Sequence, residues 1–158
     1  MAAKWNWESG EGLLGLDDPA EWDAAYDRGE RSLGTAAIGL AFNCPLTEAS
    51  PRIVRAMHLP DHGQRGFGFT AAGAAARLNG ALTPELYAAL RAEGPGGFAE
   101  HALRDTLGFV PFRRLPPWFK WQTVRMTVQD KLTYWWMLRE DATDTVRRTL
   151  RRRPWRRS

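Results

Sequence analysis

The chain has 158 residues, 44% of them hydrophobic and eight of them tryptophan, which argues against general disorder and predicts one domain or a small array with a core. Its longest apolar runs are too short to cross a bilayer, and we find no charged start followed by an apolar segment that would indicate a secretory signal. The single cysteine, Cys44, excludes a disulfide within the chain and fits a reducing compartment. We therefore expect a cytoplasmic protein.

The net charge of +4 is unevenly distributed, because residues 146–158 hold seven arginines and no acid and leave −3 on the remainder. An arginine-rich end with an interleaved indole can bind nucleic acid, an anionic membrane surface or an acidic protein. The same segment can equally be a solvent-exposed end with no binding role. The nucleic-acid alternative assigns the binding residues as Arg147, Arg148, Arg151, Arg152, Arg153, Trp155, Arg156 and Arg157, with Arg113, Arg114 and Arg125 extending the basic area.

Helix start and stop signals divide the chain after an expected extended lead-in over residues 1–17. Asp18-Pro19-Ala20-Glu21 reads as an N-cap, a first-turn proline and a capping-box glutamate. Asn79-Gly80 is typical of a helix end, and Thr83-Pro84 of the next start. From such signals we expect helices over 18–29, 31–42, 50–57, 67–78, 83–92 and 98–109.

Residues 65–92 predict a helical hairpin that has an imperfect copy upstream. Five residues, Arg31, Gly34, Ala37, Gly39 and Ala41, recur 34 positions later as Arg65, Gly68, Ala71, Gly73 and Ala75. A period in this range is typical of helix-pair arrays, in which each unit buries its apolar face against its neighbours. Coincidence in a chain rich in alanine and arginine is the alternative.

This pattern resembles the HEAT-repeat family in its small bacterial form, over about residues 31–110. The resemblance is carried by Arg65-Gly66, Ala71-Ala72-Gly73, Ala76-Arg77, Gly80-Ala81-Leu82 and the helix opening from Ala99 to Asp105. It implies docking scaffolds, inhibitors or immunity proteins against toxins, and in one branch DNA glycosylases. For a glycosylase, Asp105 or Asp130 would be the only candidate acids. The break at 59–64 and the tryptophan-rich 118–136 depart from the family pattern.

Residues 118–140 follow a proline-rich connector at 110–117 and fit two structures. Trp121, Val124, Val128, Leu132 and Trp135 form a stripe at helical spacing. Alternation between Thr123 and Gln129 would instead suit a β-hairpin. We favour a helix from Pro117 to about Glu140, followed by a short helix over 142–153. The expected organisation is a lead-in over 1–17, one helical domain over 18–140 and a tail over 141–158.

No constellation in the sequence predicts catalysis or metal binding. His58 and His62 have the spacing of a zinc pair, but Pro60 between them argues against one continuous helix. His101 and Asp105 lie one helical turn apart, a spacing more typical of a surface pair. Cys44 has no basic partner nearby, so we expect an inert thiol. We expect neither an enzyme nor a cofactor.

The fold we predict is all-α, a short right-handed stack of antiparallel HEAT-like helix pairs with a Trp-rich C-terminal helix or hairpin. A helix that buries Trp121, Leu132 and Trp135 leaves Trp118 or Trp136 near the surface, where tryptophan is often an interface anchor. We therefore expect a non-enzymatic protein that binds a protein partner, as an inhibitor, immunity or adaptor/assembly subunit. The predicted protein-binding residues are Trp118, Trp121, Trp136, Arg113 and Arg114.

Overall fold

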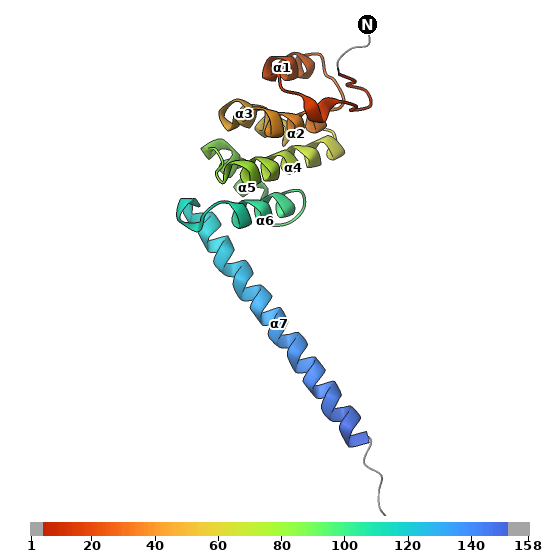
Figure 1. The fold of residues 1–158 in the computed structure, drawn as a ribbon, viewed down its shortest axis with the longest axis vertical. Coiled ribbons are helices and arrows are strands. Elements are labelled where there is room, and N and C mark those ends of the chain that lie inside the picture. The colour runs from red at the N-terminus through yellow and green to blue at the C-terminus, as the bar shows by residue number, and fades with distance from the viewer. Residues whose placement is uncertain (1–4, 152–158) are drawn as a thin grey trace, which may run out of the picture. The chain divides into compact units, whose positions relative to one another are not determined.

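The computed structural model describes the backbone of residues 5–151 and the side chains of residues 5–137. Within that range all regular secondary structure is helical and there is no strand, which confirms the predicted all-α class. The chain divides into two compact units, Met1–Pro116 and Pro117–Ser158, called here the first and second units (Figure 1). We expected a boundary near residue 140, whereas the structure divides the chain after Pro116.

The first unit contains six α-helices and two short 3-10 helices among its described residues. In chain order these are η1 (Leu13–Gly15), α1 (Pro19–Asp27), α2 (Leu33–Asn43), α3 (Leu46–Ala56), α4 (His62–Asn79), α5 (Pro84–Glu93), α6 (Ala99–Phe109) and η2 (Phe112–Arg114). The second unit is described as one helix, α7 (Pro117–Arg151). None of the helices in the described part of the chain is long and apolar enough to span a membrane.

Local signals placed three helix ends correctly. The Asp18 carboxylate accepts hydrogen bonds from the backbone N–H groups of Ala20 and Glu21 and so caps α1. Gly80 ends α4 in the left-handed conformation, with φ of 57°. The Thr83 hydroxyl accepts from the Leu86 N–H at the start of α5. These ends depend on residues adjacent in sequence, which explains why the sequence predicts them.

Two predicted starts were wrong because proline and glycine were given too much weight as helix breakers. The helix expected from residue 50 begins at Leu46 and contains Pro51 in its interior. The helix expected from residue 67 begins at His62, because the Asp61 carboxylate accepts a hydrogen bond from the Gln64 N–H and caps it one turn early. In both cases the expected helix is present and begins earlier in the chain than predicted.

The first unit is built as two layers of helices (Figure 1). Helix α4 packs between α2 and α6 in one layer, and α3 packs against both α1 and α5 in the other. The close contacts Gly66–Phe98, Gly73–Ala102 and Gly80–Phe109 advance in the same direction along the two helices, so α4 and α6 run parallel. The alanine-rich faces of α2 and α4 permit this close packing, because a small side chain lets backbones approach.

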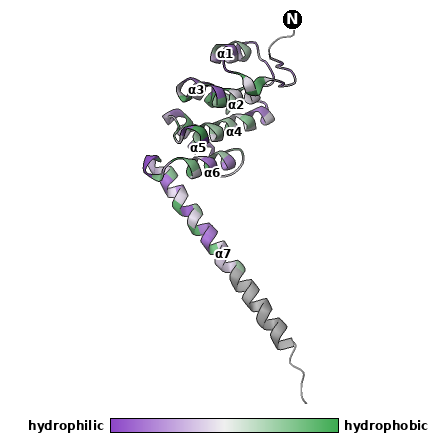
Figure 2. Cartoon of the chain, in the orientation of Figure 1, coloured by the Kyte–Doolittle hydropathy of each residue, from purple (hydrophilic) through white to green (hydrophobic). Residues whose placement is uncertain are grey.

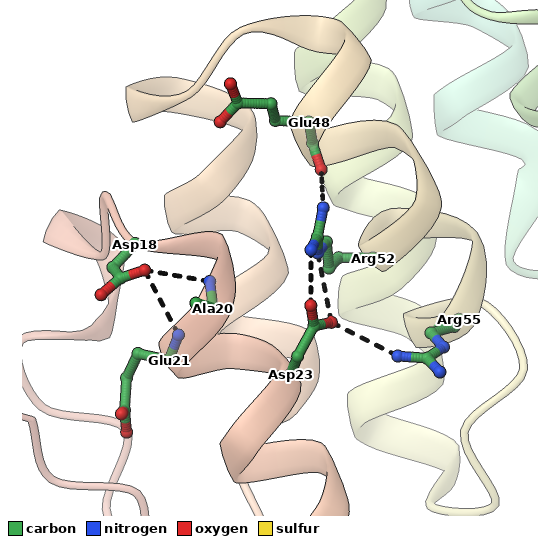
Figure 3. Close-up of polar contacts among 7 residues, drawn as sticks. All are labelled: Asp18, Ala20, Glu21, Asp23, Glu48, Arg52 and Arg55. Atoms are coloured by element: carbon green, nitrogen blue, oxygen red, sulfur yellow. Dashed lines mark hydrogen bonds and ion pairs between the residues drawn. The ribbon is translucent and has the colours of Figure 1, made fainter.

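Helix α1 is attached to the layers by one buried aromatic residue and by an ion-pair cluster. Trp22 is fully buried and its indole N–H donates to the Leu33 carbonyl at 3.0 Å. On the neighbouring turn Asp23 accepts hydrogen bonds from Arg52 and Arg55 of α3 (Figure 3). Arg52 also donates to the Glu48 carbonyl. The charged cluster covers the edge of the contact that Trp22 fills.

Helix α7 is continuous from Pro117 to Arg151 and has 35 residues. Residues 118–140, for which we weighed a helix against a hairpin, lie within it. The separate short helix expected over 142–153 was wrong, because the same helix passes through residue 140 without interruption. No proline or glycine occurs between Trp118 and Arg151, and this absence of breakers explains the continuity.

Candidate functional site

The largest unexplained feature of the described chain is an exposed apolar stripe on α7. On an ideal wheel of 3.6 residues per turn its members fall within an arc of about 80°. They are Trp121, Val124, Val128, Leu132 and Trp135, with exposed fractions of 57%, 54%, 49%, 55% and 70%. We call these five residues the α7 arc. Figure 2 shows hydrophobic and hydrophilic positions interspersed along this part of the helix.

The exposure of the α7 arc corrects the sequence interpretation. The periodicity predicted that this stripe would face inward, but all five side chains are about half exposed or more. The spacing was correct, but the second unit is described as this one helix, and its described residues hold no other element that could bury the stripe. Exposed apolar patches are features that protein and membrane interaction sites share.

The three predicted tryptophans occupy different positions relative to the α7 arc. Trp121 belongs to it, and the guanidinium of Arg125 lies 5.5 Å from its ring centroid. Trp118 is half-buried and makes an edge-to-face contact with Phe119 at 4.9 Å between centroids. Trp136 is 64% exposed and lies about 80° from the centre of the arc on the ideal wheel. Val128, which we did not select as a binding residue, is the central member, and Trp135, also not selected, lies as far from it as Trp121 does.

The remaining predicted binding residues are basic. Arg113 and Arg114 are exposed and form two thirds of the 3-10 helix η2 in the first unit. Arg147, Arg148 and Arg151 belong to the last part of α7, where only the backbone is described. The other members of the nucleic-acid alternative, Arg152, Arg153, Trp155, Arg156 and Arg157, lie outside the described residues.

Charged residues flank the α7 arc on both sides with one sign. On the ideal wheel Arg125 lies on one flank, and Lys120 and Lys131 lie on the other. The only acid between residues 117 and 137, Asp130, projects away from the arc at about 160° from its centre on that wheel. The described part of α7 is therefore an amphipathic helix whose apolar face is bordered by cations.

Three titratable residues of the first unit that the sequence singled out make structural contacts, and a fourth, His101, is exposed. His58 Nδ1 lies 2.8 Å from the Val54 carbonyl, and the His62 ring packs edge-on against Phe98. Asp105 makes an ion pair with Arg77, with both carboxylate oxygens within 3.1 Å of one guanidinium nitrogen. Among the described residues no three His, Cys, Asp or Glu side chains gather as a metal site would require. None of these groups forms the acid–base or nucleophile pair that catalysis requires.

Cys44 is free, half-buried and located just after the end of α2. Burial, followed by the nearby carboxylates of Glu48, Asp17 and Asp18, raises the pKa of its thiol above the ordinary value. Arg52 opposes this shift only weakly. The thiolate, which is the reactive form of cysteine, is therefore disfavoured at neutral pH.

Two open clefts in the first unit offer no better candidate. One, of about 710 Å³, includes Glu8, Arg31 and Asp61 in its wall, and Glu8 is already paired with Arg31 at 2.6 Å. The other has a volume of about 530 Å³ and is lined by residues of α3 and by the start of α5. Two of its lining residues, Ser50 and Thr83, are hydrogen-bonded to each other. Neither brings a nucleophile next to a base.

Comparisons with models of known families, with curated proteins and with solved structures found no match.

Proposed function

We propose that this chain is a non-enzymatic binding protein whose docking element is the α7 arc. The observation that supports the proposal is the co-alignment of five apolar side chains, each 49–70% exposed, on one face of a helix. Large aromatic residues at such positions are typical anchors of protein interfaces, because they bury much area at a small cost in conformational entropy. The partner is a second protein molecule, and the chain serves as an inhibitor, an immunity protein or an adaptor/assembly subunit.

The first unit is the scaffold in this proposal, as a HEAT-like stack of helix pairs. Two features support the HEAT-like interpretation: α2, α4 and α6 pack in sequence as one layer, and α3 and α5 pack together in the other. In such a stack each helix pair covers the next, so the scaffold can be extended without a central cavity. The pairing of its charged residues with one another, as in Arg52–Asp23, Arg65–Glu93 and Arg77–Asp105, supports a structural role over a catalytic one.

The test compares two aromatic residues that are adjacent in sequence and on different faces of α7. Trp135 lies in the arc, whereas Tyr134 is 59% exposed and lies about 120° from its centre. Once the full chain has been used to isolate a protein partner, the affinity is measured by calorimetry for the wild type, Trp135→Ala and Tyr134→Ala. We expect Trp135→Ala to weaken binding by at least about tenfold. Equal effects of the two substitutions would refute the assignment.

A helical circular dichroism spectrum and an unchanged unfolding midpoint for both variants are required controls. Deletion of residues 147–158 tests the nucleic-acid alternative in the same protein. If a protein partner still binds to the truncated chain with unchanged affinity, the arginine-rich tail is not the docking element. If the only ligand recovered is nucleic acid, and it is lost with the tail, the proposal is wrong.

A further inference from the structure

We infer that the partner of the α7 arc is a second copy of this chain, paired antiparallel about a two-fold axis at Val128. The inference rests on the proposed function and names the occupant of the same site. It follows from the order and size of the exposed residues and from the area they offer.

The α7 arc has a symmetric order. Its members are separated by 3, 4, 4 and 3 residues, so the arrangement is the same from either end. Trp121 and Trp135 are equidistant from Val128, as are Val124 and Leu132. A two-fold interface must be self-complementary, so that residue i meets residue j of the other copy and j meets i. Antiparallel pairing about Val128 meets this condition. Trp121 then faces Trp135 of the second copy, Val124 faces Leu132, and Val128 faces Val128.

Residue size also permits close approach at the centre of the pair. Valine at the middle position allows two helix axes to come within about 8–10 Å. The indoles lie at either end of the overlap, which spans about 21 Å from residue 121 to residue 135 at 1.5 Å per residue. Each Trp121 ring would therefore enclose one end of the interface together with Trp135 of the second copy.

The exposed area is sufficient for a modest dimer. Tryptophan offers about 200 Å² when fully buried, so Trp121 and Trp135 at their observed exposures contribute roughly 250 Å² per copy. Two copies double this to about 500 Å², and the three aliphatic residues of each copy bring the total toward the ~1,200 Å² at which standard interfaces begin. We therefore expect a dimer with a dissociation constant in the micromolar range.

The symmetric spacing of the arc, and not the flanking charges, favours the antiparallel orientation. A parallel pair would bring Lys120 within five residues of Arg125 of the second copy, and the antiparallel pair brings it equally near Lys131, so the two arrangements place cations together to a similar extent. A parallel pair sets each residue opposite itself whatever the spacing. The antiparallel pair requires equal spacing on either side of Val128, which the arc has.

Disulfide trapping tests the geometry in the full chain. Each variant carries Cys44→Ala to remove the native thiol, and single cysteines are then introduced at positions on the α7 arc. We expect Val128→Cys to form a covalent dimer under mild oxidation, because the two-fold axis places this position opposite itself. Val124→Cys and Leu132→Cys should not cross-link alone but should do so when mixed. Self-cross-linking of Val124→Cys would indicate a parallel pair and overturn the inference.

Sedimentation equilibrium measures the association itself, over concentrations up to about 100 µM, well above the expected dissociation constant. Val128→Arg places a charge at the centre of the arc and should raise the dissociation constant at least tenfold. Met137→Arg is the matched control, because Met137 is 56% exposed and lies on the opposite face of α7. It should leave the constant within about threefold of wild type.

The outcomes separate this inference from the proposed function. A chain that stays monomeric at every concentration, but binds another protein through Trp135, refutes self-association and leaves the proposed function standing. A monomer that binds neither refutes both. Binding to vesicles with anionic headgroups, without dimerisation, also overturns the inference, because a lipid surface would then be the occupant of the arc.

Discussion

Gln64 performs a task that its position in the sequence does not reveal. Ser32, at the N-cap of α2, makes no side-chain capping bond. The amide oxygen of Gln64, from the first turn of α4, instead accepts hydrogen bonds from the N–H groups of Gly34 and Thr35 at 2.8 and 3.1 Å. One side chain therefore caps a helix that begins 31 residues earlier in the chain and joins the starts of two helices that pack side by side.

Gln64→Ala should therefore destabilise the first unit by more than an ordinary surface substitution. Loss of a helix cap costs about 1 kcal/mol, and the two N–H groups left half-buried add about as much again. We expect a loss of about 2 kcal/mol in the free energy of unfolding. For a unit of this size the melting temperature should fall by roughly 8 °C.

Urea denaturation followed by circular dichroism at 222 nm measures this change, with an unchanged m value as the sign that the unfolded state is unaffected. Gln64→Glu is the control, because its carboxylate keeps an acceptor at the same place and carries a charge that helix N-termini favour. It should unfold within about 0.5 kcal/mol of wild type. The reasoning is refuted if Gln64→Ala costs less than 0.5 kcal/mol, or if Gln64→Glu is as destabilising as Gln64→Ala.

Three further predictions follow from contacts in the first unit. Gly39→Ala should cost about 1–3 kcal/mol in urea unfolding, because a Cβ there would lie 2.1 Å from the Leu13 carbonyl oxygen and the backbone would have to move. Arg52→Ala should cost only about 1 kcal/mol, since its pairing with Asp23 is partly exposed, and the difference from wild type should shrink in 1 M NaCl. A loss unaffected by salt would show that packing, and not charge, is responsible. Cys44 should react with iodoacetamide more slowly than a free thiol at pH 8, with the midpoint of its pH–rate profile above the ordinary thiol value, because burial and nearby carboxylates raise its pKa. The same shift makes Cys44 favour folding below the ordinary thiol pKa. That contribution should be lost as the pH rises through the higher pKa of the folded state, and Cys44→Ala should remove this dependence.

The sequence predicted which residues form the α7 arc, but it did not predict that they are exposed. The five residues of the α7 arc were identified as one stripe from their spacing, because an α-helix places residues three and four apart on the same side. Their exposure was not predictable, since burial depends on which other surfaces reach that face. The basic residues Arg113 and Arg114 are exposed, and they belong to the first unit and not to the helix that carries the arc.

The sequence by itself determined the helical class and those helix ends that depend on adjacent residues, such as the Asp18 cap and the left-handed Gly80. These features involve hydrogen bonds and backbone angles within about four residues, so the local chain contains all the necessary information. Only the tertiary structure decided that Gln64 caps α2, that the backbone at Leu13 approaches Gly39, and that no second helix among the described residues of its own unit covers the α7 arc. Each of those facts depends on where a distant segment packs, and a one-dimensional pattern of polarity does not specify which surface will cover a given face.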